Sequence, residues 1–158
     1  MAITFTVNGA AKSVAAPETA TLLDVLRNQL GLMGTRYGCG LEQCGCCMVL
    51  VDGHPVHACT REVGTVAGKK VTTIEGLGSE AEPHPLQQAF LDEQAGQCGY
   101  CLSGILISAK ALLDKNPKPS RADVVAALDK HLCRCGSHTR ILRAVERAAT
   151  AMRDGRPA

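Results

Sequence analysis

The sequence is poor in aromatic residues and has no block of like charge. Its 158 residues include two Phe, two Tyr and no Trp, too few rings for a surface that stacks nucleic-acid bases. The formal net charge is +2, and no dense run of Lys and Arg offers a track for phosphates. The composition therefore argues against a nucleic-acid partner.

Long apolar runs are also missing. A transmembrane helix needs roughly 20 apolar residues, and no run approaches that length, so we expect no direct membrane insertion. The first residues, MAITFTVNGAAKSV, lack the basic start and apolar centre of a signal peptide and alternate like a strand. We therefore expect a cytoplasmic protein, unless a partner carries the chain to the periplasm or to a membrane by a twin-arginine route.

Cysteine, in contrast, is abundant, with nine residues in two groups. Structural disulfides are rare in the cytoplasm, and an odd count fits disulfide pairing poorly. Metal binding or redox chemistry is therefore the leading interpretation.

The N-terminal half predicts mainly strands. Residues 3–7 alternate apolar and polar side chains, and the following Asn8-Gly9 pair is a strong hairpin signal. Residues 48–58 predict a second hairpin around an Asp-Gly turn, and residues 69–74 a last strand.

One helix is expected within this half, capped by Thr21 or Thr19. Its buried face would be formed by four leucines: Leu22, Leu23, Leu26 and Leu30.

The C-terminal half predicts four short amphipathic helices, arranged as a compact bundle. Pro85 suits the first position of one helix, and Ser120 with Asp123 resembles a capping box. The second helix carries an apolar stripe made of Leu102, Ile105, Leu106, Ala109, Leu112 and Leu113. The last carries one made of Ile141, Leu142, Val145, Ala148, Ala149 and Met152.

The segment 76–85, which contains Gly, Ser and two prolines, predicts a linker between the halves. We therefore expect an α+β chain with two domains, a strand-rich domain over residues 1–78 and a helical domain over residues 79–158.

The first cysteine group has the spacing Cys39-x4-Cys44-x2-Cys47, and eleven residues separate Cys47 from Cys59. This matches the plant-type ferredoxin pattern for a [2Fe–2S] cluster. Zinc sites more often have two short Cys pairs, and zinc stays the main alternative.

Three glycines between these cysteines support the cluster interpretation. Without Cβ atoms, Gly38, Gly40 and Gly45 allow the backbone to approach a cluster, to adopt positive φ and to aim N–H groups at sulfur.

Cys46 is the extra thiol. It lies between the candidate ligands Cys44 and Cys47, and adjacent residues rarely point at one metal, so we expect a small buried hydrophobic residue rather than a ligand. A redox or alternative-ligand role is the competing interpretation.

The second group pairs Cys98-x2-Cys101 with Cys133-x-Cys135. Both pairs lie near predicted helix beginnings, where free N–H groups favour thiolates. The sequence allows a second two-iron cluster here.

Two histidines flank the second group, so zinc held by mixed ligands is the alternative. We expect His131 to be a surface residue near the end of a helix and His138 a polar residue in the first turn of the last helix.

The order of these eight cysteines, with Gln97 before Cys98 and Gly136 after Cys135, resembles the small iron–sulfur subunit of the molybdenum hydroxylases, the xanthine oxidase and aldehyde oxidase family. The likeness covers about residues 3–150. It implies a β-grasp, plant-ferredoxin-like domain followed by a four-helix domain, each with one [2Fe–2S] cluster.

The resemblance also implies partners. A large subunit would hold the molybdopterin cofactor and the substrate site, and a flavin subunit or a cytochrome would accept the electrons. Gln97 matches a residue that hydrogen-bonds the pterin, and Cys135 matches the ligand nearest the pterin amino group. No catalytic residue is expected in this chain.

The stretches TTIEGLGS, HPLQQAFLDEQAGQCGYC and AKALLDKNPKPS most resemble small subunits of nicotinate dehydrogenase and isoquinoline oxidoreductase. Hydroxylation of an N-heteroaromatic such as nicotinate is therefore the expected overall reaction. The alternatives are the small subunit of an aldehyde dehydrogenase of this family, a stand-alone two-cluster ferredoxin and a zinc-stabilised interaction module.

Overall fold

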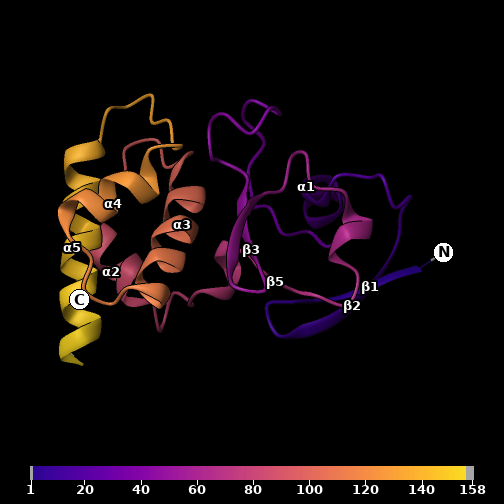
Figure 1. Cartoon of the computed structure of the whole chain (residues 1–158), viewed down its shortest axis with the longest axis horizontal. Coiled ribbons are helices and arrows are strands. Elements are labelled where there is room, and N and C mark those ends of the chain that lie inside the picture. The colour runs from indigo at the N-terminus through magenta and orange to yellow at the C-terminus, as the bar shows by residue number, and fades with distance from the viewer. Residues whose placement is uncertain (1, 156–158) are drawn as a thin grey trace.

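The computed structural model describes residues 2–155 and places a strand-rich half beside a helical half (Figure 1). The strands are β1 (Ala2–Val7), β2 (Ala10–Ala15), β3 (Met48–Val51), β4 (His54–His57) and β5 (Lys70–Thr72). They form one sheet in the order β2-β1-β5-β3-β4, in which only the β1–β5 pair is parallel. This mixed sheet agrees with the expected β-grasp half.

Both predicted hairpins turn where the sequence indicates. Asn8 and Gly9 have φ values of 49° and 82°, and Asp52 and Gly53 have 49° and 80°. Positive φ at both central residues is typical of a type I′ turn, whose twist suits two antiparallel strands. The second hairpin leads the chain away from one cysteine loop and back toward Cys59.

The predicted helix after Thr21 covers nearly the expected residues, but most of it is not an α-helix. Thr21 caps α1 (Leu22–Asp24), which continues into a single π-helical turn, η1 (Val25–Gln29). There the N–H of Leu30 donates to the carbonyl of Val25, five residues back instead of four. Three of the four predicted leucines are buried against the sheet, while Leu30 lies at its margin.

Two short 3₁₀ turns, η2 (Val63–Val66) and η3 (Ile74–Gly76), flank β5. The helical half then contains the four predicted helices: α2 (Pro85–Asp92), α3 (Leu102–Lys115), α4 (Arg121–Leu128) and α5 (His138–Asp154). Pro85 occupies the first turn of α2, and Ser120 and Asp123 form the predicted capping box of α4.

α3 is more deeply buried than its single predicted stripe indicates. All its residues from Ser103 to Ala109 are buried. Ile105 packs within the helical core, while Ile107 on another side packs against Met48 and Leu50 of β3. α3 therefore lies between the other helices and the sheet, and joins the two halves (Figure 1).

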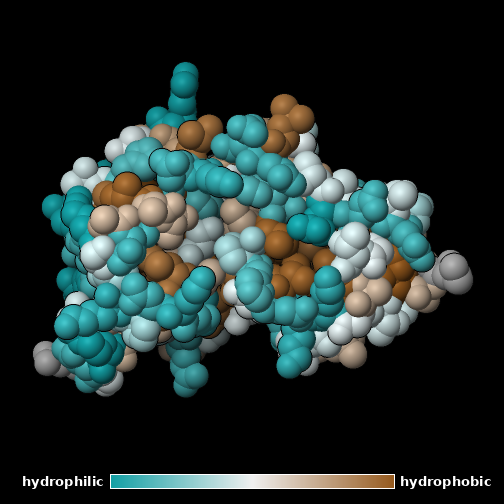
Figure 2. Space-filling view, in the orientation of Figure 1, coloured by the Kyte–Doolittle hydropathy of each residue, from teal (hydrophilic) through white to brown (hydrophobic). Residues whose placement is uncertain are grey.

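On the face shown in Figure 2, hydrophilic side chains cover most of the surface and separate the apolar patches. Among residues 2–155, no helix is both long and apolar enough to cross a bilayer.

Candidate metal centres

The first cysteine group is gathered by the loop before β3 and by the residue after the β3–β4 hairpin. The thiols of Cys39 and Cys44 lie close enough to interact, as do those of Cys47 and Cys59. The structure therefore brings together all four predicted thiols as two pairs. Cys44, Cys47 and Cys59 are buried, and Cys39 is half-buried.

Backbone N–H groups point at the sulfurs of this loop. Leu41 and Gln43 donate to Cys39 Sγ at 3.3 and 3.2 Å, and the N–H of Cys39 donates to Cys44 Sγ at 3.4 Å. Burial alone would raise the pKa of Cys39, but these hydrogen bonds outweigh burial and hold the pKa at about 7. The same donors would stabilise negative charge on a cluster.

The glycines of this loop serve two different needs. Gly40 and Gly45 adopt positive φ, 70° and 73°, as predicted. Gly38 has an ordinary φ and is required for space instead, because a Cβ there would lie 2.6 Å from Cys44 Sγ. Only a backbone without side chains can wrap this closely around the thiols.

Cys46 is the ninth thiol, and it lies beside these pairs, near Cys44 and Cys47. It is 6% exposed and packs in the core of the helical half, with its Sγ 4.0 Å from the carbonyl oxygen of Cys44. Burial, reinforced by neighbouring thiols, raises the pKa of Cys46 to about 12. It is thus a neutral buried residue, as predicted.

The second group lies at the beginnings of α3 and α5. Cys101 is the N-terminal cap residue of α3, and Cys133 and Cys135 lie in the α4–α5 connection. The sulfurs of Cys98 and Cys135 are 3.5 Å apart, and the thiols of Cys101 and Cys133 lie close enough to interact. Again four predicted thiols form two pairs.

This second group is more open than the first. Cys98 is exposed, Cys133 and Cys135 are half-buried, and only Cys101 is buried. Burial raises the pKa of Cys101 to about 12, whereas the N–H of Tyr100 and the thiol of Cys135 lower the pKa of Cys98.

Two thiol pairs in each group suit a two-iron cluster, in which each iron takes two protein ligands. A zinc site instead needs four donors around one point. The paired thiols of each group therefore suit [2Fe–2S] clusters.

The two histidines near the second group differ. His138 opens α5 and is exposed, as expected. The prediction for His131 is wrong, because its side chain is 4% exposed and its Nε2 lies 2.7 Å from Ser108 Oγ of α3. Burial lowers the pKa of His131 to about 4. Its partner is 23 residues away, so no local pattern reveals it.

The two cysteine groups are directly linked. The N–H of Leu132, next to Cys133, donates to the carbonyl of Cys44 at 3.1 Å. Nothing in the sequence marks Leu132, whose backbone alone makes the link.

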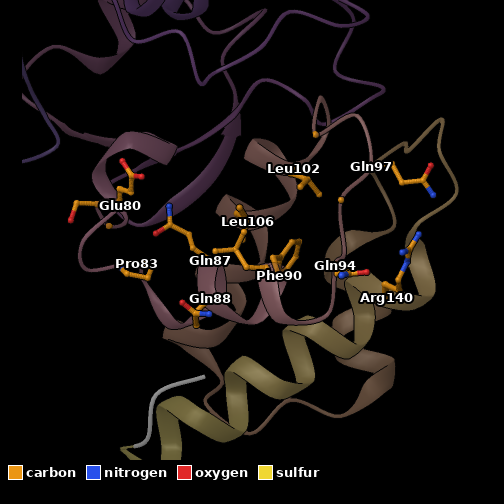
Figure 3. A pocket seen from close by; sticks show the side chains of 15 residues that line it. Glu80, Pro83, Gln87, Gln88, Phe90, Gln94, Gln97, Leu102, Leu106 and Arg140 are labelled. Atoms are coloured by element: carbon orange, nitrogen blue, oxygen red, sulfur yellow. The ribbon is translucent and has the colours of Figure 1, made fainter.

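Gln97 lines a surface pocket of about 860 Å³ beside Cys98. Figure 3 shows Gln97 and Arg140 at one end of this pocket and Glu80 and Pro83 at the other. Gln97 is exposed and directly precedes Cys98 of the second cysteine group.

Comparisons with known proteins agree with this geometry. The family described as "2Fe-2S iron-sulfur cluster binding domain" matches residues 5–72, and the "[2Fe-2S] binding domain" family matches residues 73–146. One nicotinate dehydrogenase subunit, from Pseudomonas putida, is 52% identical over 96% of both chains. The alpha subunit of isoquinoline 1-oxidoreductase from Brevundimonas diminuta is 49% identical, over 93% of this chain and 97% of its own.

A solved structure shows the same fold. The aldehyde oxidoreductase of Desulfovibrio desulfuricans superposes with a TM-score of 0.94 at 44% identity. The match covers 97% of this chain but 17% of that longer polypeptide. The chain therefore belongs to the molybdenum hydroxylase family of oxidoreductases, as one of its small electron-transfer subunits with two [2Fe–2S] binding domains.

Proposed function

We propose that this subunit relays electrons from a large molybdopterin-binding subunit to a flavin subunit or a cytochrome. The observation that carries the proposal is the Leu132–Cys44 hydrogen bond, which joins two groups of four thiols within one fold. When bound, the two clusters supply the electron carriers. The chain's own residues hold them, surround them with N–H donors and fix their separation.

We assign the ligands by the thiol pairs. The first group, in residues 1–78, comprises Cys39 with Cys44 and Cys47 with Cys59. The second group, in residues 79–158, comprises Cys98 with Cys135 and Cys101 with Cys133. Free thiols in this number support a reducing compartment, the cytoplasm, as the location.

We take the direction of transfer from the family resemblance, which places the pterin near Gln97 and Cys135. The second group opens toward the pocket at Gln97, so we place the entry of electrons there, with Gln97 and Cys135 facing the pterin of the partner. The first group, whose loop carries the 71% exposed Leu41, is the outlet.

Substitution of Gln97 tests the entry point. In the native complex, Gln97→Ala should lower the molybdopterin retained and slow reduction of the clusters by substrate, because an amide partner of the pterin is lost. Gln88→Ala, which alters the same pocket on α2, is the matched control. Unchanged retention and rate in Gln97→Ala would refute this role.

We propose hydroxylation of an N-heteroaromatic such as nicotinate as the overall reaction, on the strength of the two similar subunits named above. Oxidation of an aldehyde is the second candidate, supported by the structural match. The natively purified complex, assayed with nicotinate, isoquinoline and benzaldehyde, distinguishes them. Elution of the chain alone, with both clusters, would instead indicate a stand-alone ferredoxin.

A further inference from the structure

His131 lies at the centre of the contact between the two halves. It follows α4, two residues before Cys133, and its ring is enclosed. Its Nε2 meets Ser108 Oγ at 2.7 Å, and Ser108, on α3, is itself buried. This hydrogen bond attaches the α4–α5 connection to the helix that separates the two halves.

The other edge of the ring rests on the first cysteine loop. A Cβ built on Gly45 would lie 2.3 Å from His131 Nδ1 and 2.7 Å from Cε1, so the ring fills the space of a side chain at Gly45. Gly45 also contacts α3, because a Cβ built on Gly104 of α3 would lie 1.9 Å from the carbonyl oxygen of Gly45. Gly45 is therefore held between the imidazole and α3.

The residues next to this contact belong to both candidate centres. Cys44 precedes Gly45, and its carbonyl accepts the N–H of Leu132. Leu132 in turn follows His131 and precedes Cys133. A displacement of the ring would therefore change the position of Cys44 relative to Cys133.

Packing alone does not account for an imidazole here. Nδ1 of His131 is buried and has no hydrogen-bond partner among the described residues. Burying an unpaired polar nitrogen is unfavourable, and an apolar side chain of similar size would avoid it. What the imidazole offers instead is a directed bond to Ser108.

We propose that His131 is a positioning residue for electron transfer, anchored by Ser108 and seated on Gly45, that fixes the separation of the two cluster-binding loops. The inference rests on the proposed function, since only a relay between two centres requires a fixed separation. Electron transfer slows steeply as the separation of two centres grows, so a small shift has a measurable effect.

The test uses the native complex carrying His131→Leu, Ser108→Ala or His131→Gln. Two readouts are needed: hydrogen exchange at the Leu132 amide, and the EPR splitting between the two clusters after full reduction with dithionite. In His131→Leu and Ser108→Ala, we expect the Leu132 amide to exchange on the order of tenfold faster, because the net stabilisation of about one hydrogen bond is lost. We also expect a smaller EPR splitting between the two clusters. His131→Gln, whose amide can reach Ser108, should restore both readouts in part.

His54→Leu, at an exposed site on the β3–β4 hairpin, controls for the loss of a histidine and should change neither readout. If His131→Leu does not assemble, Ser108→Ala decides alone. Wild-type exchange and splitting in Ser108→Ala or in an assembled His131→Leu would overturn the inference. Absence of two clusters from the wild-type protein would instead refute the proposed function.

Discussion

Cys46 and Cys47 are adjacent buried thiols whose surroundings differ. Cys47 is paired with Cys59, at the centre of the first group. Cys46 packs in the core of the helical half, and its thiol lies close to those of Cys44 and Cys101. Burial keeps this thiol neutral, and the four predicted ligands form two pairs without it.

We predict that Cys46→Ala retains both clusters, with about four irons per chain, because its buried thiol is neutral and the eight other cysteines supply four ligands to each cluster. Cys47→Ala is the matched variant and should retain about two irons, those of the second cluster. Iron and sulfide analysis with visible absorption spectra measures both. Loss of a cluster from Cys46→Ala would show that this thiol is a ligand.

The eight thiols could be identified from the sequence because their spacing is local and distinctive. His131 could not be placed correctly, because its burial depends on Ser108 and Gly45, which are remote in the chain. The local pattern around His131 predicts a polar residue just after a helix, and such a residue ordinarily faces solvent. Contacts between the two halves bury it instead.

Among the secondary-structure elements, α2 begins with an unusual cap. His84 Nδ1 accepts the N–H of Leu86 at 3.1 Å, and the N–H of His84 donates to Gln87 Oε1 at 2.9 Å. Burial, followed by the nearby charge of Lys110, lowers the pKa of His84, while Asp114 opposes this. The cap requires the neutral ring, since a protonated Nδ1 cannot accept a hydrogen bond.

We therefore predict that acid weakens this helix. The folded-state pKa of His84 lies below its ordinary value of 6.5, so the unfolded chain takes up protons first as the pH falls. The stabilisation is complete above pH 6.5 and is lost as the pH falls through the folded-state pKa.

The thermal midpoint of wild-type protein should thus decline as the pH falls below 6.5. His84→Asn keeps an N-terminal cap without a titrating ring and should show a smaller decline. Equal declines in both proteins would exclude His84 as the source.

Most elements were predictable, because hairpin turns, helix caps and apolar periodicity are local signals. The π-helical turn η1 was not, since the leucine spacing fits an ordinary helix equally well. The double burial of α3 was also missed, because Ile107 lies off the predicted stripe and is buried only by its contact with β3.

In the molecule as a whole, the two halves are held together by α3 and the first cysteine loop. Gly104 makes this contact possible because it has no side chain where the carbonyl of Gly45 approaches. A glycine inside a helix ordinarily costs about 0.5–1 kcal/mol relative to alanine. Here the close approach of the loop explains why the glycine is needed.

We predict that Gly104→Ala destabilises the protein by roughly 1–3 kcal/mol, despite the better helix propensity of alanine, because the added methyl group meets backbone. The thermal midpoint should fall by roughly 2–4 °C for each kcal/mol. Ser103→Ala, which removes a buried hydroxyl without a hydrogen-bond partner among the described residues, is the control and should not lower the midpoint. A Gly104→Ala protein as stable as wild type would contradict the close contact.

The most direct test of the two-cluster relay is iron and sulfide analysis of the natively purified protein, combined with low-temperature EPR after reduction. We predict about four irons per chain and two distinct [2Fe–2S] signals, one from each group of four thiols. Zinc without iron would contradict the relay. It would indicate instead that the two cysteine groups are structural zinc sites of a binding module.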